Sequence, residues 1–348
     1  MSTTTSIEWT DVTWNPVRGC SLVSAGCANC YAMKQAHRFS GTGKPYEGLT
    51  EIGPQGPRWN GKVRLVPEAL EEPLHWKQPR RVFVNSMSDL FHEDVPDEFI
   101  AAVFGVMCVA SHHTYQILTK RPERMRTWFG WIADRGALAH YVADRCDALY
   151  PGALPAERSC AGLVWSGLPE RATWPLPNVW LGVSVEDQAT ADERIPILLQ
   201  TPAAVRFISA EPLLSRVSII RYLYKNMDVT GDFRTFRGKR QVKFVHEGLS
   251  GGLHWAIIGG ESGPRARPCD LAWIRSIKDQ CQAAEVPVFI KQIGARWYDK
   301  EARCGIRGSV AVPIDRPWMW VTQRDRKGGD FDDAEFPVDL RVRDFPNT

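Results

Sequence analysis

The strongest constraint on the fold is an alternation of short apolar runs with segments of helical period. The apolar runs contain consecutive hydrophobic residues, as in VFV at 82–84, AII at 256–258 and VFI at 288–290. Uninterrupted apolar runs are typical of strands that are covered on both faces, as in parallel sheets flanked by helices. The alternation repeats about six or seven times, so the sequence predicts an α/β fold.

Right-handed crossovers leave two main architectures for such a chain, an open doubly wound sheet and a closed or partial barrel. No G-x-G-x-x-G motif follows a predicted strand, so the pattern for dinucleotide binding is lacking. We predict a partial (β/α) barrel of six to seven mainly parallel strands with helices outside, over residues 1–297. A basic insertion at about 216–254 interrupts it, and residues 298–348 form an irregular C-terminal tail that packs on the barrel.

The composition predicts a cytoplasmic protein without a membrane partner. No stretch approaches the ~20 apolar residues that a membrane span needs, and the first nine residues lack the apolar core of a signal peptide. Cysteines scattered along the chain favour a reducing compartment. The net charge of +3 is close to balance, so charge alone does not indicate nucleic acid or membrane as a partner.

Three of the nine cysteines, Cys20, Cys27 and Cys30, form a C-x6-C-x2-C cluster. Disulfide geometry would pair two of them and leave the third, whereas all three thiolates on one loop can bind a single metal centre. A [4Fe-4S] cluster with one open iron fits three ligands. Zinc with His37 as the fourth ligand, and reduced cysteines without metal, are the alternatives.

Polar side chains follow most of the predicted strands, where a (β/α) barrel carries its functional site. We take Glu211, Glu261 and Lys291 as candidate catalytic residues, because carboxylates and amines serve as general acids and bases. Lys120 and Arg121 follow the third strand, and we expect them to pair with carboxylates such as Glu123 or Glu211. The competing interpretation is that turns and helix caps require Ser, Asp and Gly at these positions anyway.

Several of these motifs occur together in a known family. They are TWNP at 13–16, the cysteine cluster, VFVNSMSDLFHE at 82–93, ILTKRP at 117–122, LGVSVE at 181–186, ISAEPLL at 208–214, GGESG at 259–263 and IKQ at 290–292. From about Trp9 to Gln292 the chain resembles the phage-associated three-Cys-motif protein family, which is itself similar to radical S-adenosylmethionine (SAM) enzymes.

The resemblance implies a cofactor scheme. Cys20, Cys27 and Cys30 would bind three irons of a [4Fe-4S] cluster, and the fourth iron would chelate SAM, whose reduction yields a 5′-deoxyadenosyl radical. The end of the second strand would contact the SAM amino group, and the end of the fourth its ribose or carboxylate. The corresponding residues are Asn85, Ser86, Ser88 and Asp89 for the second strand, and Ser184 and Glu186 for the fourth.

The chain departs from the usual radical SAM pattern at three places. The first gap of the cysteine motif has six residues instead of three, Asn29 stands where an aromatic residue is common, and the GGE at 259–261 follows the sixth strand instead of the second.

The basic insertion combines cations with aromatic residues, the side-chain types that bind phosphates and stack on bases. The residues expected to contact nucleic acid are Arg234, Arg237, Lys239 and Arg240. A solvated β-hairpin with its aromatic residues on the barrel is the alternative.

We therefore expect a radical SAM-like enzyme that modifies or repairs a nucleic acid or nucleotide, with flavodoxin or ferredoxin as reductant. A nucleic-acid-binding protein with a structural Fe-S or zinc centre is the second hypothesis. A metal-free barrel enzyme that uses Glu186, Glu211 and Lys291 in acid/base roles is the third.

Overall fold

The computed structural model describes residues 5–133, 175–223, 233–236, 239–242, 252–299, 321–322 and 337–346. By its internal contacts the chain divides into two compact units. The first comprises residues 1–183 and 201–205, and the second comprises residues 184–200 and 206–348.

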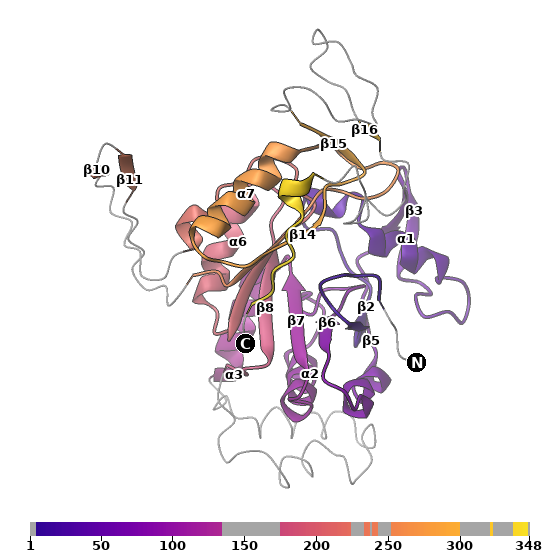
Figure 1. Ribbon diagram of the computed structural model, residues 1–348. Helices are drawn as coiled ribbons and strands as arrows, with labels where there is room; N and C mark the ends of the chain where they lie inside the picture. Colours follow the sequence, from indigo (N-terminus) through magenta and orange to yellow (C-terminus); the bar gives the residue numbers. More distant parts are fainter. Residues whose placement is uncertain are drawn as a thin grey trace. The chain divides into compact units, whose positions relative to one another are not determined.

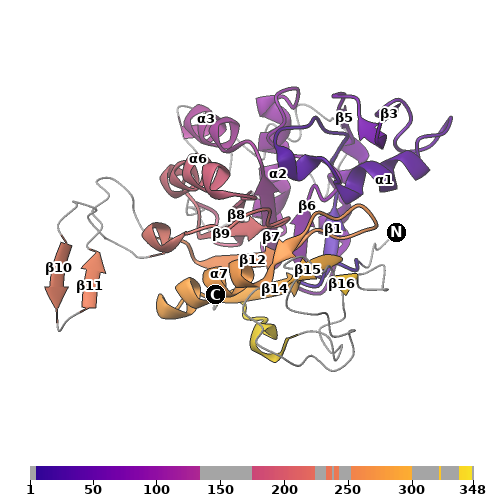
Figure 2. The same ribbon diagram turned by 90° about the horizontal axis from the view of Figure 1, so that it is seen from above.

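The principal sheet contains seven parallel strands, seen in Figures 1 and 2. Their order is β1 (Val12–Trp14), β6 (Arg81–Val84), β7 (Thr114–Thr119), β8 (Val179–Ser184), β9 (Val205–Ala210), β12 (Trp255–Gly259) and β14 (Val288–Gln292). Order along the sheet follows order along the chain, whereas a doubly wound sheet reverses its order at a switch point. The prediction of an α/β fold with a partial barrel is confirmed, and the sheet curls into a half-barrel.

The helices occupy the connections that the alternation predicts. They are α1 (Tyr31–Arg38), α2 (Asp97–Val109), α3 (Pro122–Ala133), α6 (Gln188–Gln200) and α7 (Leu271–Ala283). Asp270 caps α7 by accepting a hydrogen bond from the Ala272 amide at 3.1 Å. None of the helices that the structure describes is long and apolar enough to cross a membrane.

The strands are buried on both faces, as their composition predicts. Every residue of β8, β9 and β12 is buried. Trp14 and Trp255 are fully buried, and the Trp14 indole N–H donates to the Ala69 carbonyl at 2.7 Å. Because parallel strands need cover on both faces, this burial explains why the apolar runs do not alternate.

The Gly- and Pro-rich residues 40–62, which their composition marks as a loop, contain a β-hairpin. It consists of β3 (Thr50–Gly53) and β4 (Gly56–Trp59), and Gly56, the first residue after the turn, has a φ of +103°. Leu49 and Trp59 pack with Ala32, Met33 and Ala36 of α1 in a small separate core. The loop prediction is wrong here because buried residues at the hairpin ends outweigh the composition between them.

The remaining elements are short. The strands are β2 (Val17–Arg18), β5 (Arg64–Leu65), β10 (Phe233–Phe236), β11 (Lys239–Val242), β13 (Cys269–Asp270), β15 (Arg296–Tyr298) and β16 (Val321–Thr322), and the 3-10 helices are η1 (Ala25–Cys27), η2 (Pro67–Ala69), η3 (Glu72–His75), η5 (Ile220–Tyr222) and η6 (Val338–Leu340). Near the C-terminus, the amides of Ile290 and Asp344 donate to the carbonyls of Val342 and Val288 at 2.9 and 2.7 Å. Most of the predicted tail lies outside the described residues.

Candidate functional site

The cysteine loop begins after β1 and is held by the segment that follows β6. Asn85 Oδ1 accepts a hydrogen bond from the Val17 amide, and Ser88 Oγ donates to the Val17 carbonyl at 2.7 Å. Asn15 Oδ1 accepts from Ser86 Oγ at 3.2 Å. Asn85 has a φ of +59°, a conformation that Asn tolerates better than most residues. Four polar side chains of the two segments thus fasten the start of the cysteine loop.

The three thiols of this loop are half-buried and lie near one another. Cys20 and Cys30 pack against the small core of α1 and the hairpin, and Cys27 Sγ accepts from the Val23 amide at 3.5 Å. Burial raises the pKa of Cys20 to about 12, Asp89 raises it further, and Arg121 opposes the shift. Burial also raises the pKa of Cys30. A metal that binds here must therefore displace thiol protons.

Among the described residues, these thiols do not form a preassembled site for a single metal ion. Within the described parts of the chain, no three or more His, Cys, Asp or Glu side chains converge as ligands of one metal ion. The thiolates of a [4Fe-4S] cluster bind separate irons, so they need not converge on one point. His37, the alternative fourth zinc ligand, lies with Nδ1 3.2 Å from Thr50 Oγ1 of the hairpin.

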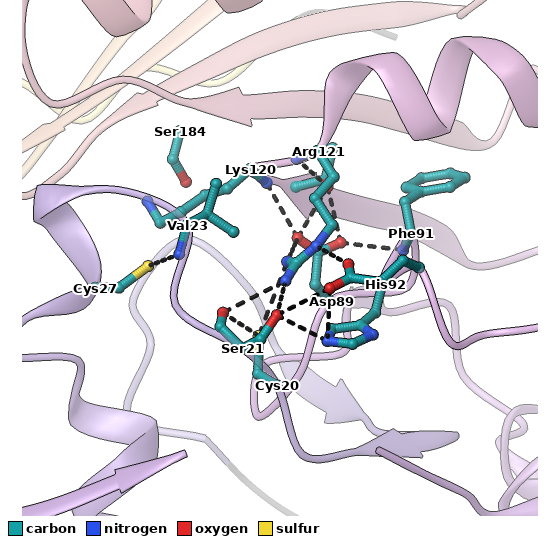
Figure 3. A network of polar contacts seen from close by, with 12 residues as sticks. Cys20, Ser21, Val23, Cys27, Asp89, Phe91, His92, Lys120, Arg121 and Ser184 are labelled. Carbon is teal, nitrogen blue, oxygen red and sulfur yellow. Dashed lines mark hydrogen bonds and ion pairs between the residues drawn. The ribbon is translucent and has the colours of Figure 1, made fainter. Parts of the chain in front are cut away.

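Arg121 connects the end of β7 to the cysteine loop (Figure 3). Its Nη1 lies 3.0 Å from Asp89 Oδ2 and 3.9 Å from Cys20 Sγ, and its Nη2 donates to Ser21 Oγ at 2.6 Å. Its Nε donates to Glu93 Oε2 at 2.9 Å. The expectation that Arg121 pairs with carboxylates is confirmed, but the named partners Glu123 and Glu211 are wrong, because Arg121 turns toward the carboxylates that follow β6. Glu123 pairs with Arg126 on the surface of α3 instead.

Both carboxylate oxygens of Asp89 are engaged by protein donors. Oδ1 accepts from the Phe91 amide at 3.0 Å and from Thr119 Oγ1 at 2.8 Å. Oδ2 accepts from the Lys120 amide at 3.1 Å and from Arg121. Asp89 therefore joins the ends of β6 and β7 and supports the cysteine loop through Arg121.

His92 contacts the loop through Ser21, whose Oγ lies 2.9 Å from His92 Nε2. The Asp94 amide donates to His92 Nδ1 at 3.2 Å, which assigns the ring proton to Nε2. His92 then donates to Ser21, and burial lowers the pKa of its ring. A serine that accepts bonds from His92 and Arg121 is a structural link and is not activated as a nucleophile.

In the second unit, Glu211 and Lys291 lie together, as two of the three candidate catalytic residues. Lys291 Nζ and Gln292 Nε2 each donate to Glu211 Oε1 at 2.7 Å. The carboxylate lies against Gly259, where an added Cβ would approach Glu211 Cδ to 3.2 Å. Glycine at the end of β12 therefore leaves room for this carboxylate–amine pair.

The third candidate, Glu261, belongs to a separate pair with Arg267. Arg267 Nε and Nη2 donate to the two Glu261 oxygens at 2.9 and 2.6 Å, and its amide donates to Oε2. The negative charge of Glu261 is thus balanced by the bidentate guanidinium of Arg267. The loop that carries Arg267 has no regular period, and sequence reasoning missed this residue.

Glu186 and Ser184 converge on Arg194 of α6. Arg194 Nη1 donates to the Ser184 carbonyl at 2.9 Å and lies 3.2 Å from Glu186 Oε2. The two side chains of this ion pair are almost completely withdrawn from solvent, with 3% and 0% exposed. Arg194 was missed as well, because arginine in a helix of mixed composition is ordinarily a surface residue.

Three of the four predicted nucleic-acid residues lie on a pair of antiparallel strands in the insertion. Arg234 lies in β10 opposite Gln241, and Arg240 lies in β11 opposite Thr235. Lys239 begins β11, and Arg237 lies outside the described residues. The backbone thus forms an antiparallel hairpin, and contact with nucleic acid stays a prediction.

The fold and the two sets of strand-end residues define an α/β half-barrel protein with a three-cysteine loop. A family model described as "Protein of unknown function (DUF5131)" matches residues 4–336. The chain therefore belongs to the DUF5131 family. No curated protein and no solved structure matches it.

Proposed function

We propose that this protein is a radical SAM-like iron–sulfur enzyme whose cluster is held by Cys20, Cys27 and Cys30. The observation that carries the proposal is the arrangement of the cysteine loop. Three thiols lie on one loop at the strand ends, and the segments that follow β6 and β7 fasten that loop. A loop that only linked β1 to α1 would not need three thiols, two of which pack on a small core and one of which lies beside an arginine.

A bound [4Fe-4S] cluster with SAM would supply one-electron cleavage of the sulfonium, which yields a 5′-deoxyadenosyl radical for hydrogen abstraction from a substrate. The chain's own contribution is to hold and shield the thiolates. Arg121 places a cation beside Cys20, which favours an anionic sulfur there. The small core beneath Cys20 and Cys30 limits their contact with water.

The substrate class that we propose is a nucleic acid or nucleotide, modified or repaired at a C–H bond. This part rests on the insertion, in which Arg234, Lys239 and Arg240 occur on one hairpin with Phe233 and Phe236. Cations and aromatic residues are the groups that bind phosphates and bases. Glu211 with Lys291 is the proposed acid/base pair at the end of the sheet strands in the second unit.

The test is anaerobic purification and reconstitution, followed by assays of iron and sulfide. SAM and dithionite are then added, and 5′-deoxyadenosine is measured by chromatography. We expect close to four irons for each chain and formation of 5′-deoxyadenosine. C27S should lose the cluster, whereas C281S, which changes a buried cysteine of α7, should retain it.

The outcomes separate the alternatives. Iron and sulfide without 5′-deoxyadenosine would favour a structural cluster in a nucleic-acid-binding protein. Zinc in place of iron would exclude the radical mechanism. Normal function of a variant in which all three cysteines are serine would favour a metal-free enzyme.

A further inference from the structure

The exposed large hydrophobic side chains of the described residues all belong to the neighbourhood of the cysteine loop. They are Leu22, Val23, Tyr31, Phe39 and Ile52. Leu22 is 50% exposed and Ile52 is 67% exposed. Single exposed hydrophobic residues are ordinary, but their restriction to one stretch of 31 residues indicates an interaction surface.

The same region carries a concentrated positive charge. Residues 15–64 contain seven Lys and Arg residues against two Glu residues, a balance of +5, whereas the whole chain has +3. Glu51 is already paired with Arg58. Lys34, Lys44 and Lys62 form no ion pair with any residue that the structure describes. These cations are therefore available to an acidic partner.

Two of the apolar residues adjoin the proposed metal ligands. Val23 donates its amide to Cys27 Sγ, and Tyr31 directly follows Cys30 at the start of α1. Phe39 ends this helix, and Thr50 of the hairpin contacts His37 in its last turn. The eight residues of α1 span about 12 Å.

A surface that includes α1 and its neighbours suits a transient protein interface. A contact that buries about 600 Å² on each partner, as in weak electron-transfer complexes, is about 28 Å across. Such an interface has an apolar centre and a charged rim. Tyr31 and Phe39 have rings that can stack on bases, but the other three side chains, Leu22, Val23 and Ile52, are aliphatic and do not stack, which favours a protein partner over nucleic acid.

We infer that the surface formed by Leu22, Val23, Tyr31, Phe39 and Ile52, with Lys34 and Arg38, docks a small acidic electron-carrier protein. The inference rests on the proposed function, because it places the electron donor over the loop that would hold the cluster. Complementary charge would steer the donor to this surface, and the apolar side chains would hold it close to the cysteines.

The test measures binding of oxidised flavodoxin and of a [2Fe-2S] ferredoxin to the reconstituted protein by biolayer interferometry at 25 and 250 mM salt. We expect binding to at least one carrier, and we expect high salt to weaken it at least tenfold. K34E and L22S/V23S should each weaken binding tenfold or more. K77E is the matched control, because exposed Lys77 precedes β6 at the other end of that strand from the cysteine loop.

Iron content and dithionite-driven formation of 5′-deoxyadenosine are measured for every variant. Dithionite delivers electrons without a carrier, so failure of the radical chemistry and failure of the docking inference give different results. If K34E keeps the wild-type iron content and the wild-type formation of 5′-deoxyadenosine but no longer binds the carrier, the result would support the inference. No salt-dependent binding, or equal losses in K34E and K77E, would overturn it. The inference would also be overturned if the protein binds a 20-nucleotide single strand and K34E weakens that binding while it leaves carrier binding unchanged.

Discussion

Arg121 Nη1 lies 3.0 Å from Asp89 Oδ2, and only 10% of the arginine side chain and 7% of the aspartate side chain are exposed. The pair joins the end of β7 to the end of β6, and the same guanidinium reaches Ser21 in the cysteine loop. Burial opposes the charged form, but Asp89 outweighs it and the pKa of Arg121 is raised, so the guanidinium stays protonated. A buried ion pair therefore links the ends of β6 and β7 and holds the cysteine loop through Ser21.

Arg121→Gln should destabilise the protein by about 3 kcal/mol, because breaking a buried ion pair leaves an uncompensated charge. The free energy of unfolding, measured in urea, checks this. Arg126→Gln in α3, the helix that directly follows Arg121, removes an exposed pair with Glu123 and should change stability by less than about 1 kcal/mol. Equal effects of the two substitutions would show that the Asp89–Arg121 pair contributes little.

Trp59→Ala should cost about 3–5 kcal/mol, since Trp59 is buried in the small core beneath the cysteines. Loss of this core should also expose Cys20 and Cys30, so both should react faster with a thiol reagent in the metal-free protein. Ile52→Ala in the same hairpin is the control, with an expected change of less than about 0.5 kcal/mol. Unchanged thiol reaction rates in W59A would mean that the hairpin does not shield the cysteines.

The fold and the position of the cysteine loop were predictable because each depends on a regular pattern. Consecutive apolar residues such as those of β12 identify buried parallel strands. The carboxyl ends of such strands share one edge of the sheet, which is why Asn85 and Ser88 were expected near the loop after β1. The contacts of both with Val17 agree with that expectation.

The partners of the charged residues were less predictable, because they depend on local side-chain geometry. Arg121 lies two positions from Glu123, yet it pairs with Asp89 and Glu93. Arg267 comes from a loop without a period, and no spacing connects it with Glu261. The small core around Trp59 was not predicted for a different reason. The strands β3 and β4 beside it are short and rich in Gly and Pro.

Glu186→Gln tests whether Glu186 is a structural or a ligand-binding residue. The ion pair with Arg194 is buried, so we expect a loss of about 3 kcal/mol in the free energy of unfolding whether or not SAM is present. Asp192→Asn in α6, the helix that carries Arg194, removes an exposed partner of Arg221 and should change stability by less than about 1 kcal/mol. Unaltered stability of E186Q with weakened SAM binding would instead assign Glu186 to the cofactor.

Acid should destabilise the protein partly through His113, a buried residue whose ring Nε2 lies 3.1 Å from the Pro73 carbonyl. Burial lowers the pKa of His113 below the ordinary value of 6.5, so the unfolded chain binds the proton more readily than the native protein. The stability that neutral His113 confers is therefore complete above pH 6.5 and is lost as the pH falls below it.

The wild-type protein should therefore lose stability between pH 7.5 and 5.5 through this residue, measured by urea unfolding at both pH values. His113→Gln keeps a donor for the Pro73 carbonyl and removes the titrating ring, so its stability should fall less over the same interval. Between pH 7.5 and 8.5 this difference between wild type and variant should stay constant. An identical loss in both proteins on acidification would show that His113 does not contribute, because a group that binds protons equally in both states cannot make folding depend on pH.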